Sequence, residues 1–304
     1  MEFAEKTDLV VTLVAPDALD PAHAAHVVEA LQLYGADHAE RLSSTATDIF
    51  CAGPVNAVRA RAADALQGRA VDAIVQPLSG RRKKLLLSDM DSTLISQECI
   101  DELAAVEGLK DRVAAITERA MRGELDFAAA LTERVALLKG IRAEAVDKLL
   151  KEVITLSPGA HEMVAALRRA GVRTVLVSGG FTVFAKPIAA RLGMDDAFAN
   201  QLAVADGALT GTVLPPILGA DAKRERLLAE CGALGIEPTD AVTLGDGAND
   251  LAMIQASGLG IAYRAKPAVA AAADAQIEHA DLSAVAYALG IPLDKYKELP
   301  PLSK

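Results

Sequence analysis

Three consecutive leucines at residues 85–87 lead directly into Asp89 and Asp91. The apolar run predicts a short buried strand. Two carboxylates at the C-terminal end of a parallel strand lie where open α/β sheets bind their ligands. The same residues also suit an aspartate-rich turn followed by a Ser/Thr helix cap. Taken alone, the pair is compatible with a ligand site and with a purely structural turn.

Two later apolar runs, residues 173–177 and 241–245, also end in polar or glycine residues. These residues are Ser178, Gly179, Asp246, Asn249 and Asp250. Because the carboxyl ends of parallel strands meet at one edge of a sheet, we expect all three strand ends to lie together. Between the two runs, Lys223 lies on a predicted helix that begins near Asp221.

This set of residues suits a phosphate ester held against a metal ion. Mg²⁺ prefers oxygen ligands and is commonly held by one or two carboxylates, for which Asp89 and Asp246 are the candidates. The metal and Lys223 would neutralise phosphate charge. The hydroxyl of Ser178 and the amide of Gly179 would bind phosphoryl oxygens where a helix begins.

The first aspartate pair then has two separate tasks. An anionic Asp89 can attack phosphorus and form an aspartyl-phosphate. Asp91 can protonate the leaving alkoxide and afterwards activate the water that hydrolyses the intermediate. Most of the catalysis would come from positioning and charge stabilisation, as phosphoryl transfer requires.

Together these segments resemble the four motifs of the haloacid dehalogenase superfamily of phosphatases. The motif residues are 89–93, 178–181, Lys223 and 245–250. Residues 98–104, 121–127 and 131–135 are similar to the cap of the phosphoserine phosphatase family. The resemblance covers roughly residues 83–290, and it implies a phosphomonoesterase that uses Mg²⁺.

The resemblance also implies a role for each matching residue. Asp89 matches the nucleophile and Asp91 the acid/base. Asp89, the backbone carbonyl of Asp91 and Asp246 match the Mg²⁺ site, and Asp250 matches a carboxylate behind it. The residues that match phosphate and substrate contacts are Ser178, Gly179, Lys223 and Asn249.

Four cap residues match the part of the family's site that recognises the amino-acid portion of the substrate. Glu98 and Arg134 match the partners of the substrate's ammonium and carboxylate, and Arg binds a carboxylate in bidentate fashion. Met121 and Phe127 match an apolar closure. Without the resemblance, Glu98 and Arg134 would be read as solvated helix charges, and the two apolar residues as cap core.

The resemblance implies hydrolysis of O-phosphoserine to serine and phosphate, the last step of serine biosynthesis. The alternative is a phosphatase or phosphotransferase that acts on another small phosphorylated amino acid or amine. A phospho-acceptor switch would also use a strand-end aspartate and Mg²⁺. Asp91 argues against a switch, because an adjacent general base would shorten the life of an acyl-phosphate.

The expected fold class is α/β, a Rossmann-like doubly wound parallel sheet with an inserted helical cap. We place the catalytic domain at residues 81–304 and the cap at about 96–155, because helical periodicity dominates residues 100–153. Alternation over residues 197–216 predicts a β-hairpin turning at Asp206 and Gly207. The alanine-rich residues 268–275 are expected to form a helix.

Residues 1–80 predict a small α+β domain in βαββαβ order. By pattern and position it resembles the ACT-like regulatory domain found ahead of some bacterial phosphatases of this kind. It would either bind an amino-acid effector such as serine or serve as a packing or dimerising appendage, which makes a homodimer a further expectation. Gly80 and the basic run after it mark the predicted boundary.

Composition excludes several other classes. A net charge of −10 with no basic face beyond residues 81–84 argues against nucleic-acid binding. Three widely spaced cysteines predict reduced thiols and a cytoplasmic setting. The N-terminus lacks a basic-plus-apolar signal, and no apolar run is long enough to span a membrane, so no membrane partner is expected.

Overall fold

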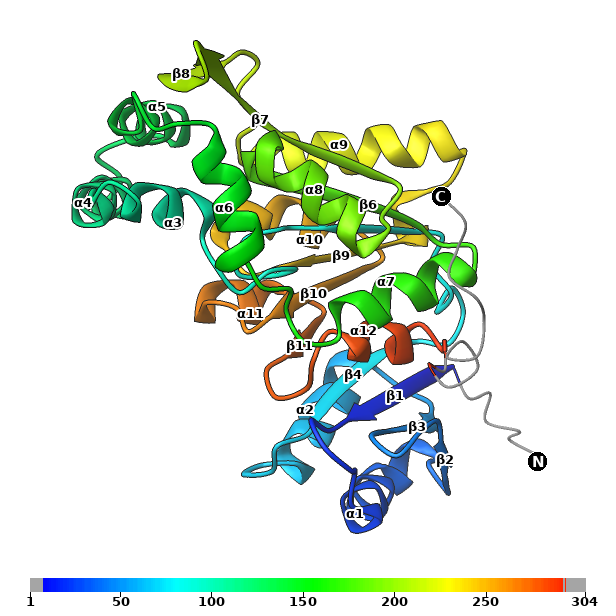
Figure 1. Cartoon of the computed structure of the whole chain (residues 1–304). Helices are drawn as coiled ribbons and strands as arrows, with labels where there is room; N and C mark the ends of the chain where they lie inside the picture. The colour runs from blue at the N-terminus through cyan, green and yellow to red at the C-terminus, as the bar shows by residue number, and fades with distance from the viewer. Residues whose placement is uncertain (1–7, 292, 294–304) are drawn as a thin grey trace.

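The computed structural model describes residues 8–291 and 293, apart from the side chains of Met121 and Ala220. The N-terminal part forms a four-stranded antiparallel sheet in the order β2-β3-β1-β4 (Figure 1). Its elements are β1 (Leu9–Val14), α1 (Pro21–Leu31), η1 (Gln32–Tyr34), β2 (Ala39–Arg41), β3 (Ala46–Cys51), α2 (Val55–Ala65) and β4 (Asp72–Pro77). The βαββαβ order expected from the sequence is therefore present, whereas its assignment as an ACT-like domain stays a prediction.

The second sheet has seven strands in the order β11-β10-β9-β5-β6-β7-β8. Its strands are β5 (Leu85–Ser88), β6 (Arg173–Phe181), β7 (Asp196–Ala205), β8 (Ala208–Leu214), β9 (Ala241–Gly245), β10 (Leu259–Tyr263) and β11 (Ala275–Ile277). All neighbours pair in parallel except β7 and β8, which form the predicted hairpin. The α/β fold class with a doubly wound sheet is confirmed.

The central strand β5 shows why this sheet needs helices on both faces. Leu85 and Leu87 belong to one core cluster and Leu86 to another, and all three side chains are fully buried. A strand buried on both faces is typical of a parallel sheet. The remaining helical elements of this part are α7 (Ala160–Arg169), α8 (Thr182–Leu192), α9 (Ala220–Leu234), η2 (Pro238–Asp240), η3 (Ala248–Asp250), α10 (Leu251–Ala256), α11 (Pro267–Ala272) and α12 (Ser283–Ala288).

The cap consists of four helices between β5 and α7, in agreement with the expected helical insertion. They are α3 (Cys99–Ala105), α4 (Lys110–Met121), α5 (Phe127–Leu137) and α6 (Glu144–Glu152). The chain leaves the core beside the place where it returns, because Ile95 and Leu156 form an antiparallel bridge. In Figure 1, the cap helices α3, α4 and α5 project to one side of the sheet.

One predicted helix is too long. The alanine-rich segment forms α11 only up to Ala272, and β11 begins at Ala275. The carboxylate of Asp274 accepts a hydrogen bond of 2.9 Å from the N–H of Gly260. This bond helps turn the chain toward β10, beside which Ala275 pairs.

The two sheets share a hydrophobic core. Val14, Ala46 and Ile74 of the N-terminal sheet belong to the same buried cluster as α12 and much of the larger sheet. The division at residue 80 therefore stays a prediction. Among the described residues, no helix is long and apolar enough to cross a membrane.

Candidate active site

The strand ends meet as the sequence predicts. Asp89 and Asp246 follow β5 and β9, which are parallel neighbours in register from Leu85 with Ala241 onward. The N–H of Asp89 donates a hydrogen bond of 2.9 Å to the carbonyl of Leu244, so the pairing continues to the aspartate itself. Asp89 is buried, with 5% of its surface exposed.

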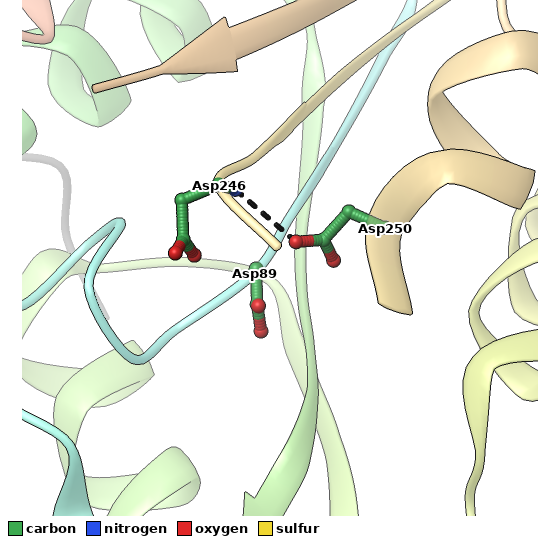
Figure 2. Close-up of side chains that lie close together, drawn as sticks. All are labelled: Asp89, Asp246 and Asp250. Atoms are coloured by element: carbon green, nitrogen blue, oxygen red, sulfur yellow. Dashed lines mark hydrogen bonds between the residues drawn. The ribbon is translucent and has the colours of Figure 1, made fainter. Parts of the chain in front are cut away.

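Three carboxylates form a compact cluster at this edge, drawn in Figure 2. Oxygens of Asp89, Asp246 and Asp250 all lie within 4.8 Å of one another. Asp250 is fully buried, and its Oδ2 accepts hydrogen bonds from the N–H groups of Asp246 (3.1 Å) and Gly247 (3.0 Å). These bonds fix the turn after β9 and leave Asp89 and Asp246 with freer oxygens. The position suits the supporting role expected for Asp250.

Lys223 contacts two of the three carboxylates in the cluster. Its Nζ is 2.8 Å from Oδ1 of Asp89 and 2.6 Å from Oδ1 of Asp250, and the side chain is 3% exposed. Burial lowers the Lys223 pKa, but the two carboxylate charges outweigh burial and leave the pKa above its ordinary value. A buried lysine held by two acids stays charged. It supplies a fixed positive charge next to Asp89.

Burial raises the pKa of three carboxyl groups in the site. It raises the pKa of Asp91 to about 7, with the charge of Glu98 as the next cause. It raises the pKa of Asp246 to about 6, helped by the charge of Asp250. The pKa of Asp89 is also raised, because burial and Asp250 outweigh Lys223. Accumulated negative charge in a buried site favours a compensating cation.

Asp91 is not a member of the cluster of three carboxylates, although it lines the same cavity. Its Oδ1 accepts a hydrogen bond of 3.0 Å from the N–H of Cys99, at the start of α3. A Cβ placed on Gly180 would come within 2.8 Å of Asp91 Oδ2, so a glycine there permits the close approach of β6. With a pKa near neutrality, the carboxyl can both donate and accept a proton. The sequence assigned its backbone carbonyl, not its side chain, to the metal, and that assignment stays a prediction.

The C-terminal end of β6, where its pairing with β7 shifts register, carries Ser178 and Gly179 into the site. Ser178 Oγ accepts a hydrogen bond of 2.8 Å from the N–H of Gly180. Asn200 stabilises this strand end, because its Nδ2 donates to the Gly179 carbonyl at 2.8 Å while its Oδ1 accepts from Leu218 N–H at 2.7 Å. Asn200 is 1% exposed, and the sequence analysis missed it because it lies in the middle of a strand.

A cavity of about 560 Å³ lies between the strand ends and the cap. Predicted site residues that line it are Asp89, Asp91, Glu98, Phe127, Arg134, Ser178, Gly179, Asp246 and Asn249. Lys223 and Asp250 lie behind this lining, whereas the Met121 side chain is outside the described residues. Asp101, Thr117 and Lys266 also line the cavity and were not predicted. Of these, only Asp101 carried a sequence signal, since it lies one helical turn after Glu98.

The cap presents opposite charges to the cavity. Arg134 is half-buried, and its Nε donates to the carbonyl of Ala130 at 3.3 Å. Burial lowers its pKa, while Asp101 and Glu98 counteract this by favouring the charged guanidinium. Glu98 Oε1 accepts a hydrogen bond of 2.7 Å from the hydroxyl of Ser92. Ser92 has a φ of 53°, a left-handed conformation that costs energy for a residue with a side chain.

Phe127 closes the apolar side of the cavity. A Cβ built on Gly179 would lie 3.2 Å from Phe127 Cζ, so the cap ring rests almost directly on the C-terminal end of β6. This contact brings α5 of the cap against the core at the point where the phosphate-binding turn is predicted. A side chain at residue 179 would push the ring away.

The chain belongs to the haloacid dehalogenase-like hydrolase family, whose model matches residues 86–255. Within that family, it is similar to a phosphoserine phosphatase of Idiomarina loihiensis, with 50% identity over 198 residues that cover 65% of this chain and 90% of the relative. The structure of a probable phosphoserine phosphatase from Vibrio cholerae superposes with a TM-score of 0.76, with 31% identity and coverage of 97% of this chain and 90% of that one.

A solved phosphoserine phosphatase, described as a phospho-aspartyl intermediate analogue, also superposes on this chain, with a TM-score of 0.63 and 44% identity. The superposition covers 68% of this chain and 98% of the other. The phosphatase resemblance inferred from the motifs is confirmed at the level of the family.

Proposed function

We propose that this protein hydrolyses O-phospho-L-serine to L-serine and phosphate in a Mg²⁺-dependent reaction. The observation that carries the proposal is the single cavity that joins Asp89 and Asp91 to Glu98 and Arg134. The first pair suits phosphoryl transfer, and the second suits a small zwitterion. Relatives that bear the name phosphoserine phosphatase support this choice of substrate.

Asp89 is the proposed nucleophile. Its carboxylate attacks phosphorus, the bond from phosphorus to the serine oxygen breaks, and an aspartyl-phosphate forms. Lys223, 2.8 Å from Asp89, favours the ionised form of that carboxyl group, partly offsetting burial and the charge of Asp250, and compensates phosphate charge. The phospho-aspartyl analogue reported for the similar solved phosphatase supports an intermediate of this kind.

Asp91 is the proposed acid and base. A pKa of about 7 leaves a large fraction of its carboxyl groups protonated at neutral pH, so that it can donate a proton to the leaving serine oxygen. The resulting carboxylate then takes a proton from the water that attacks the phosphorus of the intermediate. Phosphate leaves, and Asp89 is regenerated. The proton that Asp91 gives to the serine oxygen is replaced by the proton that it takes from water, so no further residue is needed for proton transfer.

Mg²⁺ fits the residues present. The donors at the strand ends are carboxylate oxygens, the ligand type this ion prefers. Asp89, Asp246 and the backbone carbonyl of Asp91 would hold it, with Asp250 behind. When bound, the ion would neutralise charge on the phosphoryl oxygens.

Substrate recognition is divided between the core and the cap. Ser178, Gly179 and Asn249 would bind phosphoryl oxygens, whereas Arg134 would bind the carboxylate and Glu98 the ammonium group. Phe127, together with Met121, would exclude water from the closed site. The alternative of another small phosphorylated amine uses the same chemistry and differs only in these cap contacts.

The test is phosphate release from phosphoserine by the purified chain in Mg²⁺, compared with phosphothreonine and phosphoethanolamine. Preferred turnover of phosphoserine is expected, because only this substrate presents both charges without an added methyl group. Release from phosphoethanolamine alone would favour the alternative. Absence of release from all three would overturn the reaction itself.

A serine effector, a homodimer and a cytoplasmic location remain proposals. A cavity of about 390 Å³ beside α1 and β2, with Glu29, Asp37 and Arg41 in its lining, supports a small charged effector. Calorimetry with serine and light scattering of the full chain test the first two. Cys51, Cys99 and Cys231 are all buried free thiols, which supports a reducing compartment.

A further inference from the structure

Helix α12 joins the N-terminal sheet to the catalytic part. In Figure 1 it lies between α7 and the strands β1 and β4. Residues 284–288 of this helix are all buried, and they belong to the core cluster that also contains Val14 and Ile74. The N-terminal sheet is therefore packed against the catalytic part through one of its faces.

The loop that leads into α12 is held by Asp72, the first residue of β4. Asp72 is 6% exposed. Its Oδ1 accepts a hydrogen bond from the N–H of Glu278 (3.1 Å), and its Oδ2 accepts from His279 (3.1 Å) and Ala280 (2.8 Å). Successive N–H groups that converge in this way form an anion-binding nest. The proposed reaction makes no use of this buried carboxylate.

The same loop contacts the segment by which the cap returns to the core. The N–H of Leu282 donates to the carbonyl of Pro158 at 3.0 Å. Gly159 has a φ of +76°, and a Cβ built on it would lie 2.6 Å from Asp281 Oδ1. Only a glycine fits both the conformation and the contact. The loop and residues 158–159 therefore form one closely packed unit.

Residues 155–157 are in turn bonded to the segment by which the chain enters the cap. The N–H of Ser157 donates to Leu94 at 2.9 Å, and the N–H of Ser96 donates to Thr155 at 3.1 Å. The Gln97 side chain adds two bonds to Thr155, at 2.9 and 3.0 Å. We call residues 92–98 and 155–159 the cap hinge. It ends at Glu98, in the lining of the active-site cavity.

We propose that Asp72 is a positioning residue that holds the cap hinge through the loop 278–282. The N-terminal part then determines the fraction of molecules in which the cap has the geometry that places Glu98 over the strand ends. The chain of contacts is continuous from Asp72 to Glu98. If fewer molecules have the cap in this geometry, a ligand that binds only the closed cap has a weaker apparent affinity.

A second anchor makes the proposal testable without detaching α12. Arg81 is buried and binds both Oδ atoms of Asp48, at 2.7 and 2.8 Å. Its Nε and Nη2 also donate to the carbonyls of Ala288 and Tyr287, each at 2.9 Å. These charge-assisted bonds hold the end of α12 independently of Asp72. A change at residue 72 should therefore loosen the loop while leaving the two sheets packed.

The experiment is hydrogen exchange of the full chain carrying Asp72→Asn. An asparagine offers one oxygen to the three N–H groups and brings an amide donor among them. Exchange at residues 92–98 and 155–159 is expected to rise about two- to thirtyfold, the range for residues that couple distant sites. Asp64→Asn is the matched control, because it removes the same charge from an exposed position on α2.

A kinetic measurement distinguishes positioning from general destabilisation, although this arm rests on the proposed function. KM for phosphoserine should rise by the same factor while kcat stays within about twofold, because saturating substrate restores the closed cap. Exchange needs no activity, so its outcome is independent of the reaction proposed. A fall in kcat with unchanged KM would overturn the positioning role.

Unchanged hinge exchange, with faster exchange confined to residues 278–283, would overturn the proposal. If Asp72→Asn does not fold, Asp72→Glu serves instead. Glutamate keeps the charge, but its extra methylene displaces the carboxylate from the three N–H groups of residues 278–280. Faster hinge exchange in this variant supports the proposal, and wild-type exchange contradicts it.

Discussion

Replacement of Lys223 by methionine removes the only cation that the described structure places within salt-bridge distance of Asp89 and Asp250. Methionine keeps an unbranched apolar chain, so the change acts on charge more than on volume. The two carboxylates would remain buried, since Asp89 is 5% and Asp250 0% exposed. Their mutual repulsion would no longer be compensated.

The size of the effect follows from this burial. Removal of one partner from a buried ion pair costs about 3–5 kcal/mol, because an uncompensated charge stays in the interior. With a urea m-value of about 2–3 kcal/mol/M, the unfolding midpoint should fall by roughly 1–2.5 M. The loss should shrink at pH 5.5, because Asp89, whose pKa is raised by burial, can then relieve the repulsion by taking up a proton.

Urea unfolding at pH 7 and pH 5.5, in EDTA and followed by circular dichroism, measures both effects. Lys186→Met is the control, because Lys186 is exposed on α8 and should change stability by less than about 0.5 kcal/mol. A loss below about 1 kcal/mol at pH 7 would refute the reasoning. So would a loss that is equal at the two pH values.

Three further outcomes are expected. Asp89→Asn should lower phosphate release at least about 10³-fold while calorimetry still detects phosphoserine binding, and retained turnover would exclude Asp89 as nucleophile. Arg134→Ala should raise KM for phosphoserine about 10- to 150-fold but leave phosphoethanolamine within about threefold, and equal losses would remove Arg134 from carboxylate recognition. Because burial raises the pKa of Asp91 to about 7 and of Asp246 to about 6, their ionisation between about pH 4 and pH 7 destabilises the metal-free fold. Melting curves should therefore show a larger Mg²⁺-induced rise in Tm at pH 7.5 than at pH 5, and an equal rise would contradict this assignment.

The strand ends were predictable because they follow from local rules. Apolar runs of strand length, each followed by Asp, Ser or Gly, specify both the strand and the position of its carboxyl end. The convergence of Asp89, Ser178 and Asp246 needed only the assumption of a parallel sheet. Secondary structure in the N-terminal part was predictable for the same reason, since its periodicity changes cleanly between strand and helix.

Contacts between distant segments were not predictable. Lys223 was expected to contact phosphate, but its ion pairs with Asp89 and Asp250 depend on how α9 packs against β5 and β6. The role of Asp72 could not be predicted from the sequence, because its partners are backbone N–H groups 206–208 residues away. The early end of α11 depends on Asp274 and the N–H of Gly260, which lies in a neighbouring strand.

The position of α12 has a consequence for the order in which the chain can fold during synthesis. Strands β1 and β4 are made first, yet one face of their sheet is covered by residues 280–291, near the far end of the chain. Until those residues leave the ribosome, Val14, Ala46 and Ile74 lack their packing partners. The N-terminal sheet can therefore form early, but it cannot complete its burial before the catalytic part is almost fully translated.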